Sequence, residues 1–157
     1  MKNLRTHLLL AGTFLCSLFA QSQTNRPPVN EPDYNKPHLF DALPARIPIT
    51  TTELNNVLDA PIGKATTLTL KTDNPVAFSG EVVSVSDKMD ANVQSVVLRS
   101  TNFEGARLTI SRIRNEDGTL SFTGRIISFK HGDLFELRNE SGSYVLVKRN
   151  FYDLVNE

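Results

Sequence analysis

Hydrophobic and polar residues alternate with a period of two from residue 65 to residue 149, which is the pattern of half-buried β-strands. Strands are predicted at residues 66–71, 77–86, 93–100, 106–114, 119–129, 133–138 and 143–149. The connectors between them are short and rich in Gly, Asn, Asp and Ser. This regular spacing predicts an all-β fold, an antiparallel meander of about six to eight strands forming a small barrel or sandwich.

A single short helix is predicted before the strands, at residues 51–59. A threonine can cap its start, and Leu54, Val57 and Leu58 recur at the i, i+3, i+4 spacing of one helix face. A proline and a glycine follow the helix and end it. Because so short a helix is marginal alone, its apolar face is expected to plug one end of the β domain.

One motif occurs twice, as Phe-(Ser/Thr)-Gly-x-(Val/Ile)-(Val/Ile)-Ser at residues 78–84 and 122–128. Weaker matches continue the repeat, at residues 97–99 with 136–138 and at residues 105–110 with 142–147. These matches predict two three-stranded halves, at about 77–114 and 119–149, whose apolar faces bury each other. The alternative is that strands share Val, Ile and Gly by composition alone.

The turn at residues 115–119 sets the register of its hairpin. A two-residue loop would place Arg125 opposite Ile110, on the apolar face. A three-residue loop ending at Gly118 places Gly124 there instead, and only this register separates most apolar from most polar side chains. Gly118 then takes the left-handed position of the turn. One exception remains, because Arg112 falls opposite Phe122 near the end of the hairpin.

In this register the residues of the repeated motif are expected to have structural roles. The residues expected to build the core or bend the strands are Phe78, Gly80, Val82, Phe122, Gly124 and Ile126. An inward-facing glycine costs stability unless a bend or a close approach requires it, so both glycines are predicted to let their strands coil around the core. The alternative reading is a ligand that approaches the backbone there.

The first 22 residues have the pattern of a secretory signal peptide. Lys2 and Arg5 precede an apolar run, and small residues follow it at the cleavage position. We expect a secreted or periplasmic protein with no membrane association after signal removal, and an uncleaved anchor is the alternative. The only cysteine, Cys16, lies in the apolar run, so the mature chain is expected to be disulfide-free.

Residues 23–48 hold six of the eight prolines and are predicted to form an extended leader, on the surface or disordered. The domain proper is then expected at 49–157. Tyr34, Leu39 and Phe40 in the leader are either a docking segment or an apolar cluster that packs on its own domain. At the other end, residues 151–155 are expected to dock on the core or to continue the sheet.

Charge is balanced, with 17 basic and 17 acidic residues, so we expect neither a nucleic-acid nor a membrane-surface partner. Residues 99–149 nevertheless hold nine basic and six acidic residues. Arg107 and Arg125 should share a sheet face near each other and form a candidate surface for an anion or a protein partner. The alternative is a solvated face whose charges prevent aggregation.

His131 and Asp133 are weak binding candidates in a turn between strands. A hydrolase built on them would need a nucleophile, and neither Ser128 nor Ser141 lies in a nucleophile-elbow motif. No metal site and no cofactor are predicted, because His131 is distant from His38 in the sequence and the mature chain has no Cys. A calcium site at Asp133 and other acidic residues has no recognisable spacing.

Several segments resemble small secreted proteins of unassigned function from Bacteroidota. They are residues 78–82, 99–102, 124–126, 131–133 and 152–157. The segment at about 50–86 also resembles β-rich propeptide modules of secreted zinc metallopeptidases. We expect a secreted, non-catalytic binding or structural module, whose partner could be another secreted protein. A propeptide-like inhibitor or chaperone of a secreted peptidase and a small hydrolase are the alternatives.

Overall fold

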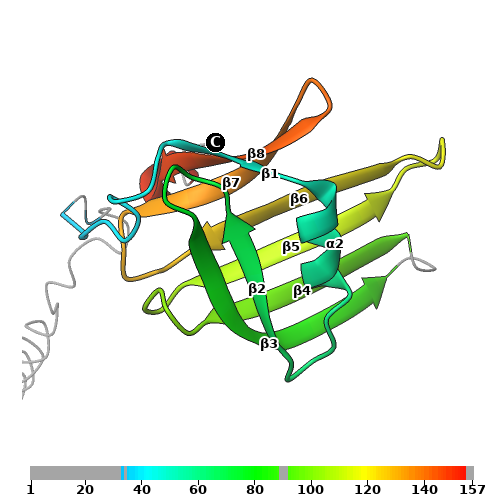
Figure 1. The fold of residues 1–157 in the computed structure, drawn as a ribbon, viewed down its shortest axis with the longest axis horizontal. Coiled ribbons are helices and arrows are strands. Elements are labelled where there is room, and N and C mark those ends of the chain that lie inside the picture. Colours follow the sequence, from blue (N-terminus) through cyan, green and yellow to red (C-terminus); the bar gives the residue numbers. More distant parts are fainter. Residues whose placement is uncertain (1–32, 34, 89–91, 155–157) are drawn as a thin grey trace, which may run out of the picture. The chain divides into compact units, whose positions relative to one another are not determined.

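The computed structural model describes residues 33, 35–88 and 92–154 (Figure 1). The predicted signal peptide and the first part of the predicted leader, including Tyr34, lie outside these residues. The described part forms one antiparallel sheet in the order β1-β8-β7-β6-β5-β4-β3-β2. Every strand from β2 to β7 therefore pairs with the next strand in sequence, and the predicted all-β meander is confirmed.

The strands follow the predicted order closely, with one addition at the start. They are β1 (Arg46–Ile49), β2 (Ala65–Leu70), β3 (Val76–Lys88), β4 (Val93–Ser100), β5 (Arg107–Arg114), β6 (Leu120–Ile127), β7 (Asp133–Glu140) and β8 (Ser143–Asn150). The sheet curls into a half-barrel, as Figure 1 shows. The two predicted halves lie in one continuous sheet, so they do not form a sandwich of two sheets.

Helix α2 (Thr51–Leu58) lies on the concave side of the curled sheet, against β2, β4 and β5 (Figure 1). Thr50 caps its start, since the Thr50 hydroxyl accepts from the Glu53 amide and the Glu53 carboxylate accepts from the Thr50 amide. This reciprocal capping satisfies two backbone donors of the first turn. The three predicted apolar residues of the helix are all buried. The helix therefore fills the hollow that the curled sheet would otherwise expose.

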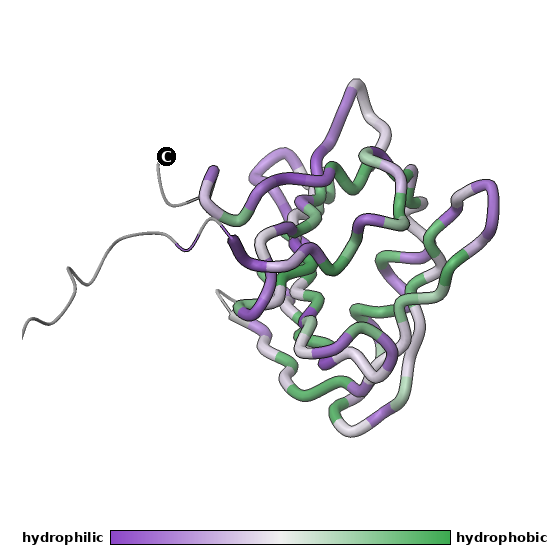
Figure 2. The backbone as a smooth tube through the Cα atoms, turned by 90° about the vertical axis from the view of Figure 1, so that its left-hand side faces the viewer, coloured by the Kyte–Doolittle hydropathy of each residue, from purple (hydrophilic) through white to green (hydrophobic). Residues whose placement is uncertain are grey.

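The core lies between the concave face and the helix. Its largest fully buried side chains are Phe40, Phe78, Phe135, Ile47, Leu54, Leu58, Leu68, Leu70, Leu98, Leu108, Ile110 and Ile126. Figure 2 shows hydrophobic positions interleaved with hydrophilic ones along the strands. This alternation places one set of side chains in the core and the other on the outer, convex face.

The segment before the helix differs from the expected surface leader. Strand β1 pairs with β8, and Ile47 and Phe40 are 0% and 1% exposed. Ile47 and Ile49 alternate with outward residues, which is a strand pattern that the prolines concealed. Pro48 is compatible with this strand because β1 is at the edge of the sheet, where a missing amide costs no ladder bond. Phe40 belongs to the core and is not available for docking to a partner.

The predicted register of the β5–β6 hairpin is confirmed. Ile110 pairs with Gly124 and Arg112 pairs with Phe122. Gly118 has a φ of 82°, in the left-handed region that the three-residue loop requires.

The glycines of the repeated motif are sites of close backbone approach. A Cβ atom on Gly124 would lie 2.4 Å from the carbonyl oxygen of Thr109 on β5. A Cβ atom on Gly80 would lie 2.3 Å from the carbonyl oxygen of Arg99 on β4. Both neighbours are backbone atoms of the paired strand and cannot rotate away. Strand β3 also has a register shift between Val82 and Ser84, just beyond its glycine, which is where a curled sheet needs extra bend.

The two halves of the predicted repeat differ in detail. Val82 pairs with Leu98, whereas its counterpart Ile126 pairs with Phe135. The match between residues 105–110 and 142–147 does not place equivalent residues on the same side of the sheet. It aligns Leu108, which faces the core, with Val145, which lies on the outer side of β8. The repeat therefore remains a prediction from the sequence.

The C-terminal segment forms a short 3-10 helix, η2 (Phe151–Leu154). The Phe151 ring packs edge-on against Phe129, with ring centroids 6.0 Å apart, and the Phe151 amide donates to the Gly132 carbonyl. The segment thus docks beside the β6–β7 turn and does not extend the sheet.

Replacing Gly124 by alanine should destabilise the domain. The added methyl group meets a backbone carbonyl, so the strands must separate, and we expect a loss of about 1–3 kcal/mol in the free energy of unfolding. Chemical denaturation measures the loss. The matched control is Thr123→Ala on the exposed side of the same strand, which should cost less. Equal stability of Gly124→Ala and the wild-type protein would contradict the close approach.

The turn of this hairpin also lowers the pKa of the Asp117 carboxyl. The Thr119 hydroxyl and, second, the Thr119 amide donate to the Asp117 carboxylate, at 2.6 and 2.9 Å, and they lower the pKa of this carboxyl. The variant Thr119→Ala keeps the amide and loses the hydroxyl. Its Asp117 pKa should rise toward the ordinary value, as an NMR titration of the carboxyl carbon can measure. An unchanged pKa would show that the amide bond alone is responsible.

Candidate functional site

The outer face of the sheet carries an arginine on each of five consecutive strands. These residues are Arg99 on β4, Arg107 on β5, Arg125 on β6, Arg138 on β7 and Arg149 on β8. Their strand partners place all of them opposite the core side, and we call this set the arginine face. The sequence predicted only two of its members, because a register could be derived from the sequence only for the β5–β6 hairpin.

The arginine face is only partly neutralised. Arg138 and Arg149 approach one carboxylate, that of Glu136, at 2.7 and 3.6 Å, and Arg99 approaches Glu81 at 3.2 Å. Within the described part of the chain, Arg107 and Arg125 form no ion pair and no side-chain hydrogen bond.

Arg107 also stands directly opposite Arg99 on the neighbouring strand. Two like charges in this position oppose sheet formation. Glu81 neutralises Arg99 but not Arg107, so the arginine face keeps unneutralised positive charge and is a candidate for binding an anion.

His131 and Asp133 lie close in the chain but have separate roles in the structure. The His131 ring nitrogen Nδ1 lies 2.8 Å from the Ser128 hydroxyl, inside the β6–β7 turn. Asp133 is 2% exposed, and its two carboxylate oxygens accept from the Leu39 and Phe40 amides at 2.7 and 2.8 Å. Ser128 is fully buried, so its hydroxyl is not presented to a substrate. The geometry makes this turn a structural support for the N-terminal segment.

Lys148 completes that support from β8. Its ammonium group donates to the Phe40 and Leu43 carbonyls, at 2.6 Å each. Together Asp133 and Lys148 satisfy four backbone groups of the segment at residues 39–43, which has no strand partner of its own. We call these two side chains the clasp, and they explain how a proline-rich segment stays against the core.

A metal ion has one set of possible ligands in the described residues. Oxygen or nitrogen atoms of His38, Asp41 and Asp133 lie within 4.8 Å of one another. Imidazole and carboxylate donors suit zinc and similar divalent ions. The structure gives these groups partners without an ion, because His38 and Asp41 lie 3.0 Å apart and the Asp133 carboxylate is bonded to the backbone. The sequence prediction of no metal site had not considered this pairing across the fold.

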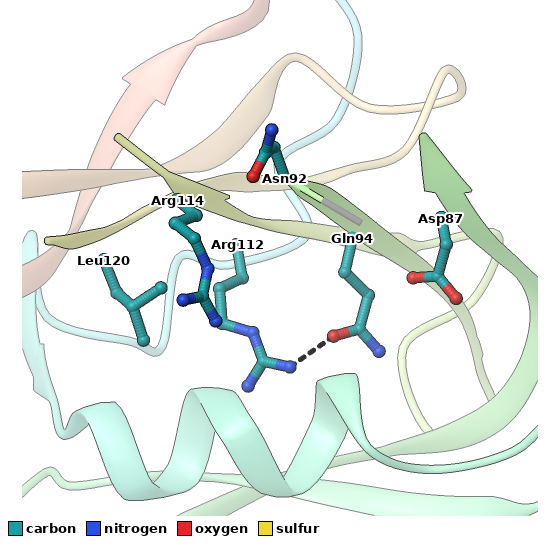
Figure 3. A pocket seen from close by; sticks show the side chains of 6 residues that line it. All are labelled: Asp87, Asn92, Gln94, Arg112, Arg114 and Leu120. Carbon is teal, nitrogen blue, oxygen red and sulfur yellow. Dashed lines mark hydrogen bonds between the residues drawn. The ribbon is translucent and has the colours of Figure 1, made fainter. Parts of the chain in front are cut away.

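A polar cavity of about 410 Å³ opens between the helix and the ends of β3 to β6 (Figure 3). Its lining residues are Asp87, Asn92, Gln94, Arg112, Arg114 and Leu120. Asp87, Gln94 and Arg112 are successive partners across three strands, and Arg114 faces Leu120 across the next pair. The cavity therefore has a fixed row of polar groups supplied by neighbouring strands.

Arg112 forms part of the cavity and anchors the helix. Its guanidinium donates to the Asn55 side-chain oxygen at 2.8 Å and to that of Gln94, and it lies 3.6 Å from the Asp59 carboxylate. The inward arginine that looked like an exception in the hairpin register is thus satisfied by the end of α2. Sequence reasoning missed the cavity because its residues are separated in the chain and have no common motif.

No family model matches the sequence, and neither a curated protein nor a solved structure matches it. Among the described residues, none of the helices has the length and hydrophobicity needed to cross a membrane. A function proposed for this chain therefore rests on the chemistry of the described surfaces.

Changing Asp133 to asparagine should loosen the clasp. The amide nitrogen of the new side chain cannot accept the second backbone donor, so one buried amide loses its partner, and we expect a loss of about 1–3 kcal/mol in unfolding free energy. Thermal and chemical denaturation measure it. Asp41→Asn is the control for an exposed carboxylate and should change stability by less than about 0.5 kcal/mol. Equal effects of the two variants would contradict the clasp.

Proposed function

We propose that this chain is a secreted or periplasmic, non-catalytic binding module whose arginine face recognises an acidic surface on another protein. The observation that supports this proposal is the row of arginines on β4 to β8, in which Arg107 and Arg125 form no ion pair with any other described residue. A guanidinium binds a carboxylate through two parallel hydrogen bonds, so these two arginines on adjacent strands offer matched sites for acidic side chains.

The composition of the face favours a protein partner. Its cations on these strands are all arginines, and Lys148 points inward to the clasp. Protein interfaces are enriched in arginine and depleted in lysine. Half-buried aliphatic residues, Val97, Ile127 and Val147, lie between the arginines on the same side of the sheet. Such a mixture of aliphatic and guanidinium groups is suited to binding the surface of another protein.

The same face lacks the features that other partners need. The outward positions on β4 to β8 hold no aromatic side chain on which a base or a sugar ring could stack. The whole-chain charge is zero, so attraction is confined to this face and does not extend over the molecule. Secretion rests on the predicted signal peptide, and a peptidase is one of the protein partners that the proposal includes.

A labelled oligoglutamate peptide tests the proposal directly. The wild-type domain should bind it with an affinity that falls as salt concentration rises, because both partners are charged and exposed. The double variant Arg107→Gln, Arg125→Gln should bind at least about tenfold more weakly, since each lost charged hydrogen bond contributes roughly 1.5–3 kcal/mol in well-formed cases. Fluorescence anisotropy gives both affinities.

The matched control is the double variant Lys64→Gln, Lys130→Gln, which removes the same charge at exposed positions outside the arginine face. It should bind oligoglutamate as the wild type does. An equal loss in both double variants would mean that only net charge matters and would overturn the proposal. Much tighter binding of heparin or of single-stranded DNA than of oligoglutamate would also overturn it, in favour of a polyanion.

A further inference from the structure

A second binding site lies at the polar cavity between α2 and the ends of β3 to β6, away from the arginine face. We propose that this cavity binds the two ends of a short peptide with free termini. Its volume of about 410 Å³ is in the range of small-molecule sites. The charge pattern, the span and one apolar wall each restrict the ligand further.

Among the described residues, the lining has one cation and one anion without a partner. The Arg112 guanidinium is balanced by Asp59 at 3.6 Å and held by Asn55 and Gln94. In the part of the chain that the structure describes, the side chains of Arg114 and Asp87 have no hydrogen bond or ion pair. A ligand complementary to this arrangement carries a negative group at the Arg114 end and a positive group at the Asp87 end.

The two charges lie at opposite sides of a floor of polar groups. Figure 3 shows Arg114 and Leu120 on one side, Asp87 on the other, and the hydrogen-bonded pair Arg112 and Gln94 between them. Asp87 and Arg112 are separated by two strand spacings, about 10 Å, and Arg114 lies two residues further along β5, about 7 Å. The backbones at Asp87 and Arg114 are therefore about 12 Å apart. An extended chain advances about 3.3–3.6 Å per residue, so a peptide of three or four residues spans this distance.

The apolar wall orients the peptide. Leu120 is 47% exposed and faces Arg114 across the β5–β6 pair. The carboxylate end of the ligand lies at Arg114, so the C-terminal residue of the peptide contacts Leu120 and is favoured when it is apolar. The Gln94 amide donates to the Leu58 carbonyl and accepts from Arg112, so these two side chains form a fixed polar floor beneath the peptide backbone. The structure thus points to a tri- or tetrapeptide with an apolar C-terminal residue.

Three forms of one tripeptide test this inference. Free Ala-Ala-Leu, its N-acetylated form and its C-terminal amide are titrated into the isotope-labelled full domain, and NMR amide shifts report both position and affinity. The free peptide should shift signals of β4 and β5 around Gln94, Arg112 and Arg114. Each blocked form should bind about tenfold more weakly or worse, because each lacks one charged hydrogen bond.

Two variants test whether Arg114 binds the C-terminus of the peptide and Asp87 binds its N-terminus. In Arg114→Gln the free peptide and its amide should bind equally, while in Asp87→Asn the free and acetylated forms should bind equally. Arg125→Gln on the arginine face is the control and should leave all three affinities unchanged. The inference is overturned if no form binds at millimolar concentration, if all forms bind equally to the wild type, or if the shifts map elsewhere. None of these outcomes bears on oligoglutamate binding, so the two proposals can fail separately.

Discussion

An open antiparallel sheet has to cover its apolar face with something other than itself, and this requirement shapes the whole domain. Curling brings the edge strands β1 and β2 toward one another but does not close the barrel, so the concave face still needs a cover. Helix α2 supplies one part of it through Leu54, Val57 and Leu58. The segment before β1 supplies the other part through Phe40 and Leu43. The glycines at positions 80 and 124 permit the curl by letting paired backbones approach closely.

Features that depend on neighbouring residues could be read from the sequence. The strands and the helix follow from local periodicity, and the β5–β6 register follows from the turn at Gly118 and the facing of Ile110. The strand β1 was missed because four residues give little periodicity and because prolines in the same stretch indicate an extended leader. Its pairing with β8 is a long-range contact that no local pattern encodes.

The candidate sites were predictable to different extents. Arg107 and Arg125 could be placed on one face because their hairpin register was known. The remaining arginines join them through the registers of β4, β7 and β8, for which no turn gave a decisive test. The cavity required knowledge of where α2 lies, since Arg112 looks misplaced until Asn55 and Asp59 are brought beside it. Asp133 was noticed as a turn residue, but its bonds to a segment more than ninety positions earlier were not foreseeable.

The pairing of the first strand with the last has a consequence for the order of assembly. Strands β2 to β8 can each pair with a neighbour as soon as the following turn is complete. Arg46 instead pairs with Val147, about a hundred residues later, and the same strand that supplies this partner also supplies Lys148 of the clasp. The N-terminal segment must therefore wait, unpaired, until nearly the whole chain is present. While the chain is being synthesised, β1 has no strand partner until β8 has emerged, so the pairing of the earliest described strand cannot be an early step.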